Sequence, residues 1–188
     1  MAKEQIKKGK GKQKMGTMST KGKGKSPMRP RLMFAHSNEE GTGSAIQVEL
    51  HPATLERPGS LMIEFADQTD AGYVDSDGYH NGGFNWSGSL KFRLKLALVG
   101  QLARVLRGEA EAIGNGDDDC VDIRRKNDTV EFSCKHTLDT AEGGIELWAR
   151  VSNEDTYTFR LRREEILILD DAIRSSMGLL AWGEGAAE

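Results

Sequence analysis

Apolar and polar residues alternate along several stretches of the chain, a pattern typical of strands that bury one face. Two such stretches, 46–50 and 130–134, each place three apolar side chains on the same side. The side chains predicted to be buried are Ile46, Val48 and Leu50 in the first stretch and Val130, Phe132 and Cys134 in the second.

An internal repeat links these two stretches. A shift of 84 positions lays 46–50 on 130–134 and 61–63 on 145–147 without a gap, and it places Gly59 on Gly143. Turn residues separate the paired stretches, with Pro58-Gly59 in the first copy and Gly143-Gly144 in the second. Two strands and their connection therefore recur together.

A second match follows each hairpin, because 91–95 resembles 158–162 at the smaller shift of 67. The difference predicts an insertion of about 17 residues in the first copy. It covers Asp67 to Gly83, is rich in Asp, Gly and Tyr, and is expected to form a surface loop.

A helix pattern follows each of these strands, since apolar residues then recur at spacings of three and four. Short apolar segments, 32–35 and 121–124, also precede each hairpin. Each unit therefore reads as four strands and a helix, and the two units should pack together as one α+β body with antiparallel sheets and two helices. The predicted helix faces are Leu96, Val99, Leu102, Leu106 and Ile113 in the first copy, and Ile166, Leu169, Ile173, Met177 and Leu180 in the second.

The charge is distributed unevenly along the chain. The whole chain has 26 basic and 29 acidic residues; residues 1–31 hold 11 and 1 of these, a net charge of +10, which leaves 15 and 28 in the remainder, a net charge of −13. The Lys/Gly-rich segment 1–31 is expected to be a disordered tail that neutralises phosphates, or simply a solubility tail. The predicted domain is 32–182, with repeats at 32–114 and 120–182, and 183–188 is a short acidic tail.

The duplicated strand-strand-strand-strand-helix unit, its Lys/Gly-rich lead and the segment Val105-Leu106-Arg107-Gly108-Glu109 resemble the Whirly family and the related mitochondrial RNA-binding (guide-RNA-binding) proteins. The resemblance covers roughly residues 32–182, although the plant Whirly motif Lys-Gly-Lys-Ala-Ala is absent. It implies a Whirly-like fold, single-stranded DNA or RNA bound along and between sheets, and a tetramer.

The strand alternation itself predicts a candidate binding surface. In each copy the apolar residues of the Phe-Arg-Leu strand face inward, so the basic residues face outward, and an aromatic residue joins them on a neighbouring strand. Aromatic rings beside cations on an open sheet can stack bases and hold phosphates. The predicted nucleic-acid-binding residues are Lys91, Arg93, Lys95, Trp148, Arg150, Arg160 and Arg162, together with Trp86 just before the first basic strand.

Two alternatives remain open for these residues. Outward-facing Glu49, Glu64, Glu131 and Glu146 could pair with the basic residues as cross-strand salt bridges. Trp86 could instead plug a sheet edge. The outward tryptophans would also leave apolar surface in water, which favours a homo-oligomer.

Enzymatic chemistry has little support in the sequence. The four histidines are scattered without metal-ligand spacing, no nucleophile and base are paired, and the two cysteines are too few for a disulfide framework. We therefore expect no catalytic residues, no metal site and no cofactor. No stretch has the roughly 20 apolar residues of a membrane span, so the expected location is cytoplasmic or nucleoid-associated, with an organellar matrix also open.

The sequence thus predicts a non-catalytic protein that binds single-stranded nucleic acid, with DNA favoured over RNA. One alternative is an oligomeric protein-interaction scaffold. Another is a nucleoid-like protein whose tail binds duplex DNA while the body multimerises.

Overall fold

The computed structural model describes residues 29–74, 76, 80–114, 119–137, 144–151 and 156–182. Most of the basic N-terminal tail and all of the acidic C-terminal tail predicted from the sequence lie outside these residues. So does the predicted Gly143 turn.

Two copies of a four-strand and helix unit form the body, as the sequence predicts. The first copy contains β1 (Arg31–His36), β2 (Ser44–His51), β3 (Ser60–Asp67), β6 (Leu90–Lys95) and α1 (Leu96–Leu106). The second contains β7 (Val121–Arg124), β8 (Thr129–Thr137), β9 (Gly144–Val151), β10 (Tyr157–Leu161) and α2 (Arg163–Trp182). The predicted α+β class is therefore confirmed.

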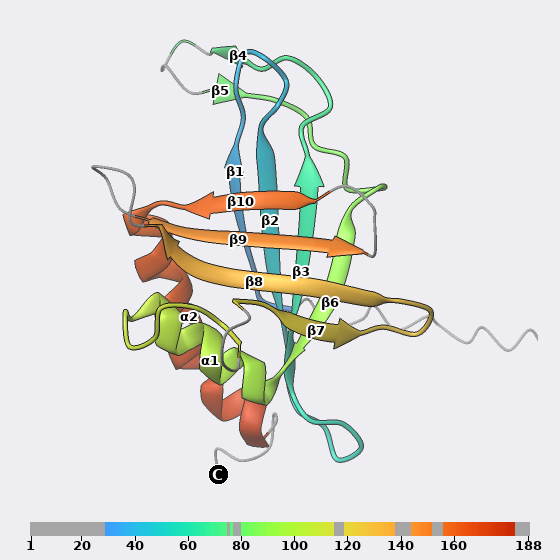
Figure 1. Cartoon of the computed structure of the whole chain (residues 1–188), viewed down its shortest axis with the longest axis vertical. Helices are drawn as coiled ribbons and strands as arrows, with labels where there is room; N and C mark the ends of the chain where they lie inside the picture. The colour runs from blue at the N-terminus through green and yellow to red at the C-terminus, as the bar shows by residue number, and fades with distance from the viewer. Residues whose placement is uncertain are drawn as a thin grey trace, which may run out of the picture.

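The strands form two antiparallel four-stranded sheets, in the orders β1-β2-β3-β6 and β10-β9-β8-β7. The sheets pack face to face with their strands crossing at a steep angle, and both helices lie at one end of the sandwich (Figure 1). Phe92 and Phe132 meet in the core with ring centroids 5.1 Å apart. The predicted inward residues of both hairpins are buried, because each sheet has only one apolar face and needs the other to cover it.

The two copies pair their strands in slightly different registers. Phe65 of β3 pairs with Ile46, whereas its equivalent Ala149 pairs with Phe132. Strand pairing thus matches Ile46 to Phe132 and not to Val130, because the connection after β2 is two residues longer than the connection after β8. The ungapped alignment was therefore wrong for the second strand. A two-residue offset preserves the alternation, so the predicted faces are unaffected.

The first helix is shorter than its apolar pattern predicts. It ends at Leu106, and Gly108 follows with a φ of 71°, a left-handed conformation that favours glycine just after a helix. Ile113 is therefore not on the helix, although it is fully buried. Its backbone N–H donates to the carbonyl of Cys134 at 2.9 Å, so the connecting segment runs along β8.

The segment from Val105 to Glu109, which carries the family resemblance, contacts α2 through Arg107. The Arg107 Nε atom donates to the Asp170 carboxylate of α2 at 2.9 Å, and Arg174 donates to the same carboxylate at 2.6 Å. Asp170 is only 8% exposed, so this carboxylate needs its two guanidinium partners. Arg107 thus connects the end of α1 to α2, which belongs to the other repeat.

Part of the insertion in the first copy forms strands where the sequence predicts a loop. It contains a small hairpin of β4 (Tyr73–Val74) and β5 (His80–Asn81). At its base lies the buried side chain of Gln68, whose oxygen accepts from the backbone N–H groups of Asn38 and Gly43 at 3.0 and 2.9 Å. Its amide nitrogen donates to the carbonyls of Asn38 and Asp70. Gln68 thereby fastens the insertion to the β1–β2 connection.

Gly59, placed by the sequence in a turn, has a packing role. A β-carbon at this position would lie 2.3 Å from the backbone oxygen of Leu180 in α2. The Gly59 N–H donates to the same oxygen at 3.2 Å. Glycine is therefore required because the end of α2 approaches the backbone before β3 closely.

Candidate nucleic-acid interface

The strand β6 presents the basic stripe that the alternation predicts. Leu90, Phe92 and Leu94 are buried, whereas the three intervening residues are exposed on the outer face of the first sheet. We call these exposed residues the β6 stripe; they are Lys91, Arg93 and Lys95. The stripe follows the free edge of that sheet.

One member of the β6 stripe is committed to a carboxylate. Lys91 pairs with Glu64 on β3, with the Lys91 Nζ atom 2.7 Å from the carboxylate. Glu64 is 5% exposed and also accepts hydrogen bonds from Gln47 and Ser89. The salt-bridge alternative is thus realised at Lys91, where the lysine neutralises a buried charge.

The other two members of the β6 stripe lie opposite uncharged residues. Arg93 faces Met62 and Lys95 faces Ser60 on β3. Within the described part of the chain neither side chain forms an ion pair. Arg93 and Lys95 can therefore take an external anion without breaking an internal contact.

A second charged group lies at the far side of the same sheet face. Glu49 binds Arg31 and Arg29 at 3.0 and 3.3 Å. Burial alone would raise the pKa of Glu49, but the hydrogen bonds from Arg31 and Arg29 outweigh burial and hold that pKa below its usual value. Burial and the charges of Arg29 and Arg93 lower the pKa of His51. These groups therefore leave a net charge of +1 on this part of the face, from two guanidiniums and one carboxylate.

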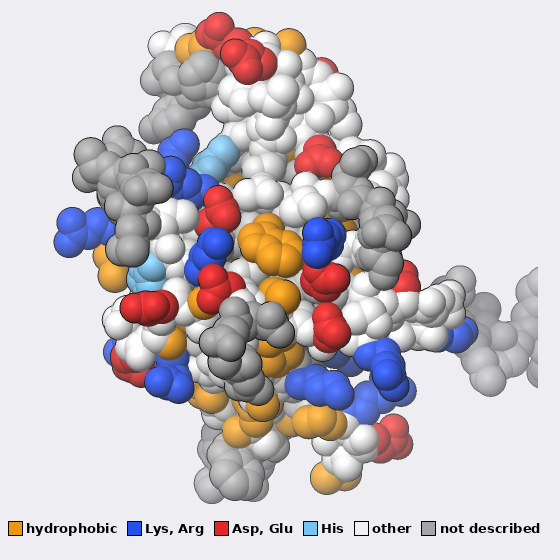
Figure 2. Space-filling view, viewed as in Figure 1, with side chains coloured by type: hydrophobic (Ala, Val, Ile, Leu, Met, Phe, Trp, Pro, Cys, Tyr) orange, Lys and Arg blue, Asp and Glu red, His pale blue; other side chains and the backbone are white. Residues whose placement is uncertain are grey.

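The outer face of the second sheet has an apolar centre between charged rows (Figure 2). Trp148 is half-buried on β9, opposite Ser133 and Thr158. The Arg150 guanidinium lies 5.7 Å from the centroid of the Trp148 ring. Arg150 also donates to Glu131 on β8 at 2.7 Å. The structure thus brings the predicted aromatic and cation together, but it also pairs that cation with a carboxylate.

The remaining basic residues of the second copy lie in two environments. Arg160 lies opposite Glu146 on β9 and is half-buried. Arg162 is exposed just before α2, and its backbone N–H donates to Glu165 at 2.8 Å. Burial alone would raise the pKa of Glu165, but the hydrogen bonds from His36 and Arg162 outweigh it, so the pKa is lowered. The Arg162 side chain is thus exposed, while its backbone N–H is bonded to a carboxylate in the first turn of α2.

Trp86 lies in the segment before β6 and is half-buried. Its ring centroid is 6.5 Å from that of Phe84, and its carbonyl accepts a hydrogen bond from Ser89. Neither Trp86 nor Trp148 is a strongly exposed apolar residue. The strongly exposed ones include Leu167, Ile168 and Leu179 of α2.

The two basic strands of the repeats lie on opposite sides of the molecule. The sheets bury their inner faces against each other, so the outer face of β6 and the outer face of β10 point in opposite directions (Figure 1). Sequence alternation gives the face of each strand but not the arrangement of the sheets. Arg93 and Trp148 are consequently not neighbours on one flat surface.

Three further basic residues, Arg124, Arg125 and Lys126, lie at the end of β7 and in the turn that follows it. Arg124 and Lys126 are exposed, and Arg125 donates to the backbone oxygen of Lys91 on β6 at 3.0 Å. The binding residues predicted from the sequence do not include these three. The run of three basic residues was the available signal, but nothing in the sequence placed the run beside the β6 stripe.

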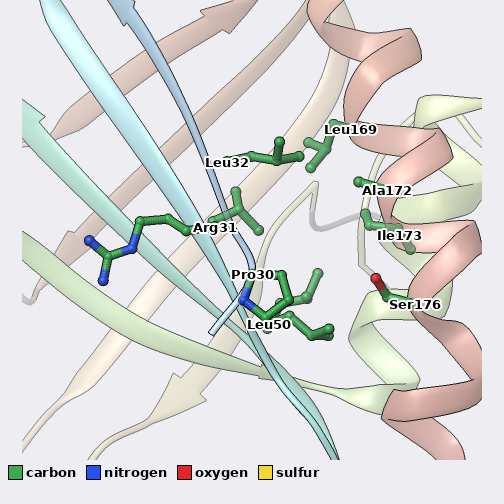
Figure 3. Close-up of a pocket in the computed structure, with 10 residues that line it drawn as sticks. Pro30, Arg31, Leu32, Leu50, Leu169, Ala172, Ile173 and Ser176 are labelled. Atoms are coloured by element: carbon green, nitrogen blue, oxygen red, sulfur yellow. The ribbon is translucent and has the colours of Figure 1, made fainter. Parts of the chain in front are cut away.

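An apolar cavity of about 140 Å³ lies between β1, β2, β3 and α2 (Figure 3). Figure 3 shows the Arg31 guanidinium pointing away from α2, so only the stem of this residue lines the cavity. Its lining includes Leu32, Val48, Leu61, Leu169 and Ile173. The cavity therefore offers apolar packing space and no group for acid-base chemistry.

The described residues contain no cluster of three or more His, Cys, Asp or Glu side chains arranged to hold a metal. Burial raises the pKa of the Cys134 thiol to about 12, so this cysteine packs as an apolar residue. Neither helix in the described part of the chain is both long and apolar enough to cross a membrane.

The two-sheet and two-helix architecture defines a Whirly-like α+β fold. The crystal structure of WHY1 from Arabidopsis thaliana matches with a TM-score of 0.56 and 12% identity, covering 84% of this chain and 88% of that chain. WHY3 from the same plant matches with a TM-score of 0.50 and 17% identity, covering 80% and 90%.

The MRP1/MRP2 structures from Trypanosoma brucei match with a TM-score of 0.51 and 13% identity, covering 80% of this chain and 92% of that chain. No family model and no curated protein matches the sequence. The resemblance to the Whirly and mitochondrial RNA-binding proteins is therefore confirmed at the level of the fold.

Lys91 and Arg93 should differ in their effect on stability although both are exposed on one strand. Lys91→Ala removes the cation paired with the buried Glu64 carboxylate and should lower the free energy of unfolding by about 1–3 kcal/mol. Arg93→Ala breaks no internal ion pair and should change it by less than about 0.5 kcal/mol. Urea denaturation of both variants measures the difference. Equal losses of unfolding free energy in the two variants would show that the buried Glu64 carboxylate is not stabilised by Lys91.

Proposed function

We propose that this protein binds single-stranded nucleic acid without catalysis, and that DNA is preferred over RNA. The observation that carries the proposal is the Arg150 guanidinium over the Trp148 ring on an open sheet face. An aromatic ring beside a cation suits a stacked base and its phosphate. The Whirly-like fold supports the proposal, since the family resemblance implies the same class of ligand.

The ion pairs on the sheet faces are compatible with this role. Arg150 and Glu131 have side chains that are 48% and 33% exposed. Exposed pairs of this kind stabilise a protein by about 0–1 kcal/mol. A phosphate can therefore replace Glu131 as the partner of Arg150 at little cost, and stacking on Trp148 contributes about 1–3 kcal/mol per base.

Substitutions on the two sheet faces test the site. Arg93→Ala with Arg160→Ala should weaken single-strand binding and lower the slope of log affinity against log salt by about 0.7 for each lost phosphate contact. Trp148→Ala should reduce the binding free energy by about 1–3 kcal/mol with little change in that slope, because stacking releases no counterions. Fluorescence titration at several salt concentrations measures both effects.

Thermal melting serves as the control for these substitutions. Trp148→Phe keeps a ring in the half-buried position and should retain more affinity than Trp148→Ala. A triple variant that lacks Arg93, Arg160 and Trp148 but melts normally and binds with unchanged affinity would rule out the sheet faces as the site.

The basic tail contributes charge and the body contributes the preference for single strands. A variant that begins at Arg29 keeps the bonds of Arg29 and Arg31 to Glu49. It should bind every nucleic acid more weakly and with a shallower salt slope, because fewer counterions are released. Titration with single-stranded DNA, single-stranded RNA and duplex DNA at one salt concentration tests this. Loss of the single-strand preference with the tail would favour the nucleoid-like alternative.

The body assembles into a homo-oligomer, a tetramer, through α2. Leu167 and Ile168 are 65% and 50% exposed on this helix, and apolar surface of this kind is usually covered by a partner. Replacing both with Gln should break the assembly and so lower its mass, as measured by light scattering. Met33→Gln, at an exposed apolar residue of β1, should leave the mass unchanged. A monomer mass for the unmodified protein at micromolar concentration would contradict the assembly.

A further inference from the structure

The turn between β7 and β8 is fastened to the edge of the other sheet. The Arg125 guanidinium donates to the backbone oxygen of Lys91 at 3.0 Å and also pairs with Asp128 of its own turn. The Arg125 N–H donates to the carbonyl of Asp128 at 2.8 Å. The turn is thereby held at a fixed position beside β6.

Fastening the turn places exposed cations of the second sheet next to the edge strand of the first sheet. Lys and Arg side chains gather beside β7 and the adjoining part of β6 (Figure 2). We use the name basic corner for four exposed cations, which are Arg93 and Lys95 on β6, and Arg124 and Lys126 at the turn. Within the described residues none of these four side chains forms an ion pair.

The acidic residues near the basic corner leave its turn side positive. Asp128 is paired with Arg125, and this hydrogen bond keeps the pKa of Asp128 below its usual value. Asp122 lies two residues before Arg124 on β7, and its strand partner on β8 is Glu131. An anion should therefore approach the Arg124 end of β7.

The corner connects the two faces that the sandwich separates. Arg150 pairs with a residue of β8, which pairs with a residue of β7, and Arg124 lies two residues further along β7. The spacing of strands and the rise per residue place Arg124 about 10 Å from Arg150 across the sheet and about 7 Å along the strand. Arg125 then places the turn against Lys91 of the β6 stripe. The route from Arg150 thus crosses the carboxylates of Glu131 and Asp122 before it reaches the cations of the basic corner.

We infer that the basic corner is the crossing point of a single strand, which lies on the Trp148 face and then turns around the edge onto the β6 stripe. This inference rests on the proposed function and adds its route. Two stacked sheets are only about 10 Å apart, whereas duplex DNA has a persistence length of about 150 base pairs. A duplex cannot follow this turn, so the corner discriminates between single and double strands.

The test replaces the two turn cations in the full chain, as Arg124→Ala with Lys126→Ala. The matched control is Arg57→Ala with Arg104→Ala, which removes the same charge from exposed positions that belong neither to the turn nor to the β6 stripe. Loss of two phosphate contacts should lower the single-strand salt slope by about 1.4 and the affinity at 0.1 M salt by about 25-fold. The control should change both much less.

Duplex DNA provides the second comparison. The turn variant and the control should lose duplex affinity equally, because a duplex does not reach around the corner. Arg125→Lys keeps the charge but loses the forked contact, so it should weaken single-strand binding with little change in salt slope, as expected of a positioning residue.

The outcomes separate the two proposals. If the unmodified chain shows no preference for single strands, the proposed function fails and the corner with it. If the unmodified chain shows that preference but the turn variant matches the control, only the corner is overturned. A loss of duplex affinity as large as the loss of single-strand affinity would also overturn it, because simple charge attraction would then explain the effect.

Discussion

The packing of the two apolar sheet faces is the interaction on which the rest of the structure depends. Each repeat alone would expose one face of its sheet, and only the other repeat covers it, with Phe92 against Phe132 in the core. This packing decides that the outward residues of the two repeats point in opposite directions. It also brings the edge strands β6 and β7 together, since the crossed sheets meet at their corners (Figure 1). The functional geometry is therefore a consequence of how the core closes.

Burial decides which outward cations are available to a ligand. Lys91 serves a carboxylate that is 5% exposed, and leaving that carboxylate without its cation costs about 1–3 kcal/mol. Arg150 serves a carboxylate that is 33% exposed, where a pair contributes about 0–1 kcal/mol. A phosphate can therefore recruit Arg150 but gains little from Lys91. Arg93 lies opposite the uncharged Met62, so a phosphate that binds Arg93 does not have to replace a carboxylate on the opposite strand. The predicted basic residues are thus unequal, although the sequence pattern treats them alike.

The sequence predicts what depends on local periodicity and fails where the outcome depends on partners. Alternation gave the strands and their buried faces, because side chains on a strand have a strict period of two. It could not give the register of β8 or the end of α1, since the length of a connection and the conformation of Gly108 decide these. The site was predicted in part for the same reason. The outward direction of Arg93 is local, but its separation from Trp148 and the position of Arg124 depend on the packing of the sheets.

The opposing charges of tail and body can coexist with binding because screening limits their range. At physiological salt an exposed charge is largely screened beyond about 8 Å. The acidic remainder of the chain, with a net charge of −13 (15 basic and 28 acidic residues), therefore has little influence on a phosphate already held by neighbouring cations. A segment rich in lysine can raise the rate of encounter with any polyanion, but charge attraction alone does not select one polyanion over another. Under the proposed function, selection would then come from a rigid surface, and Arg125, bonded to both Asp128 and the Lys91 carbonyl, fixes the turn where the two sheets meet.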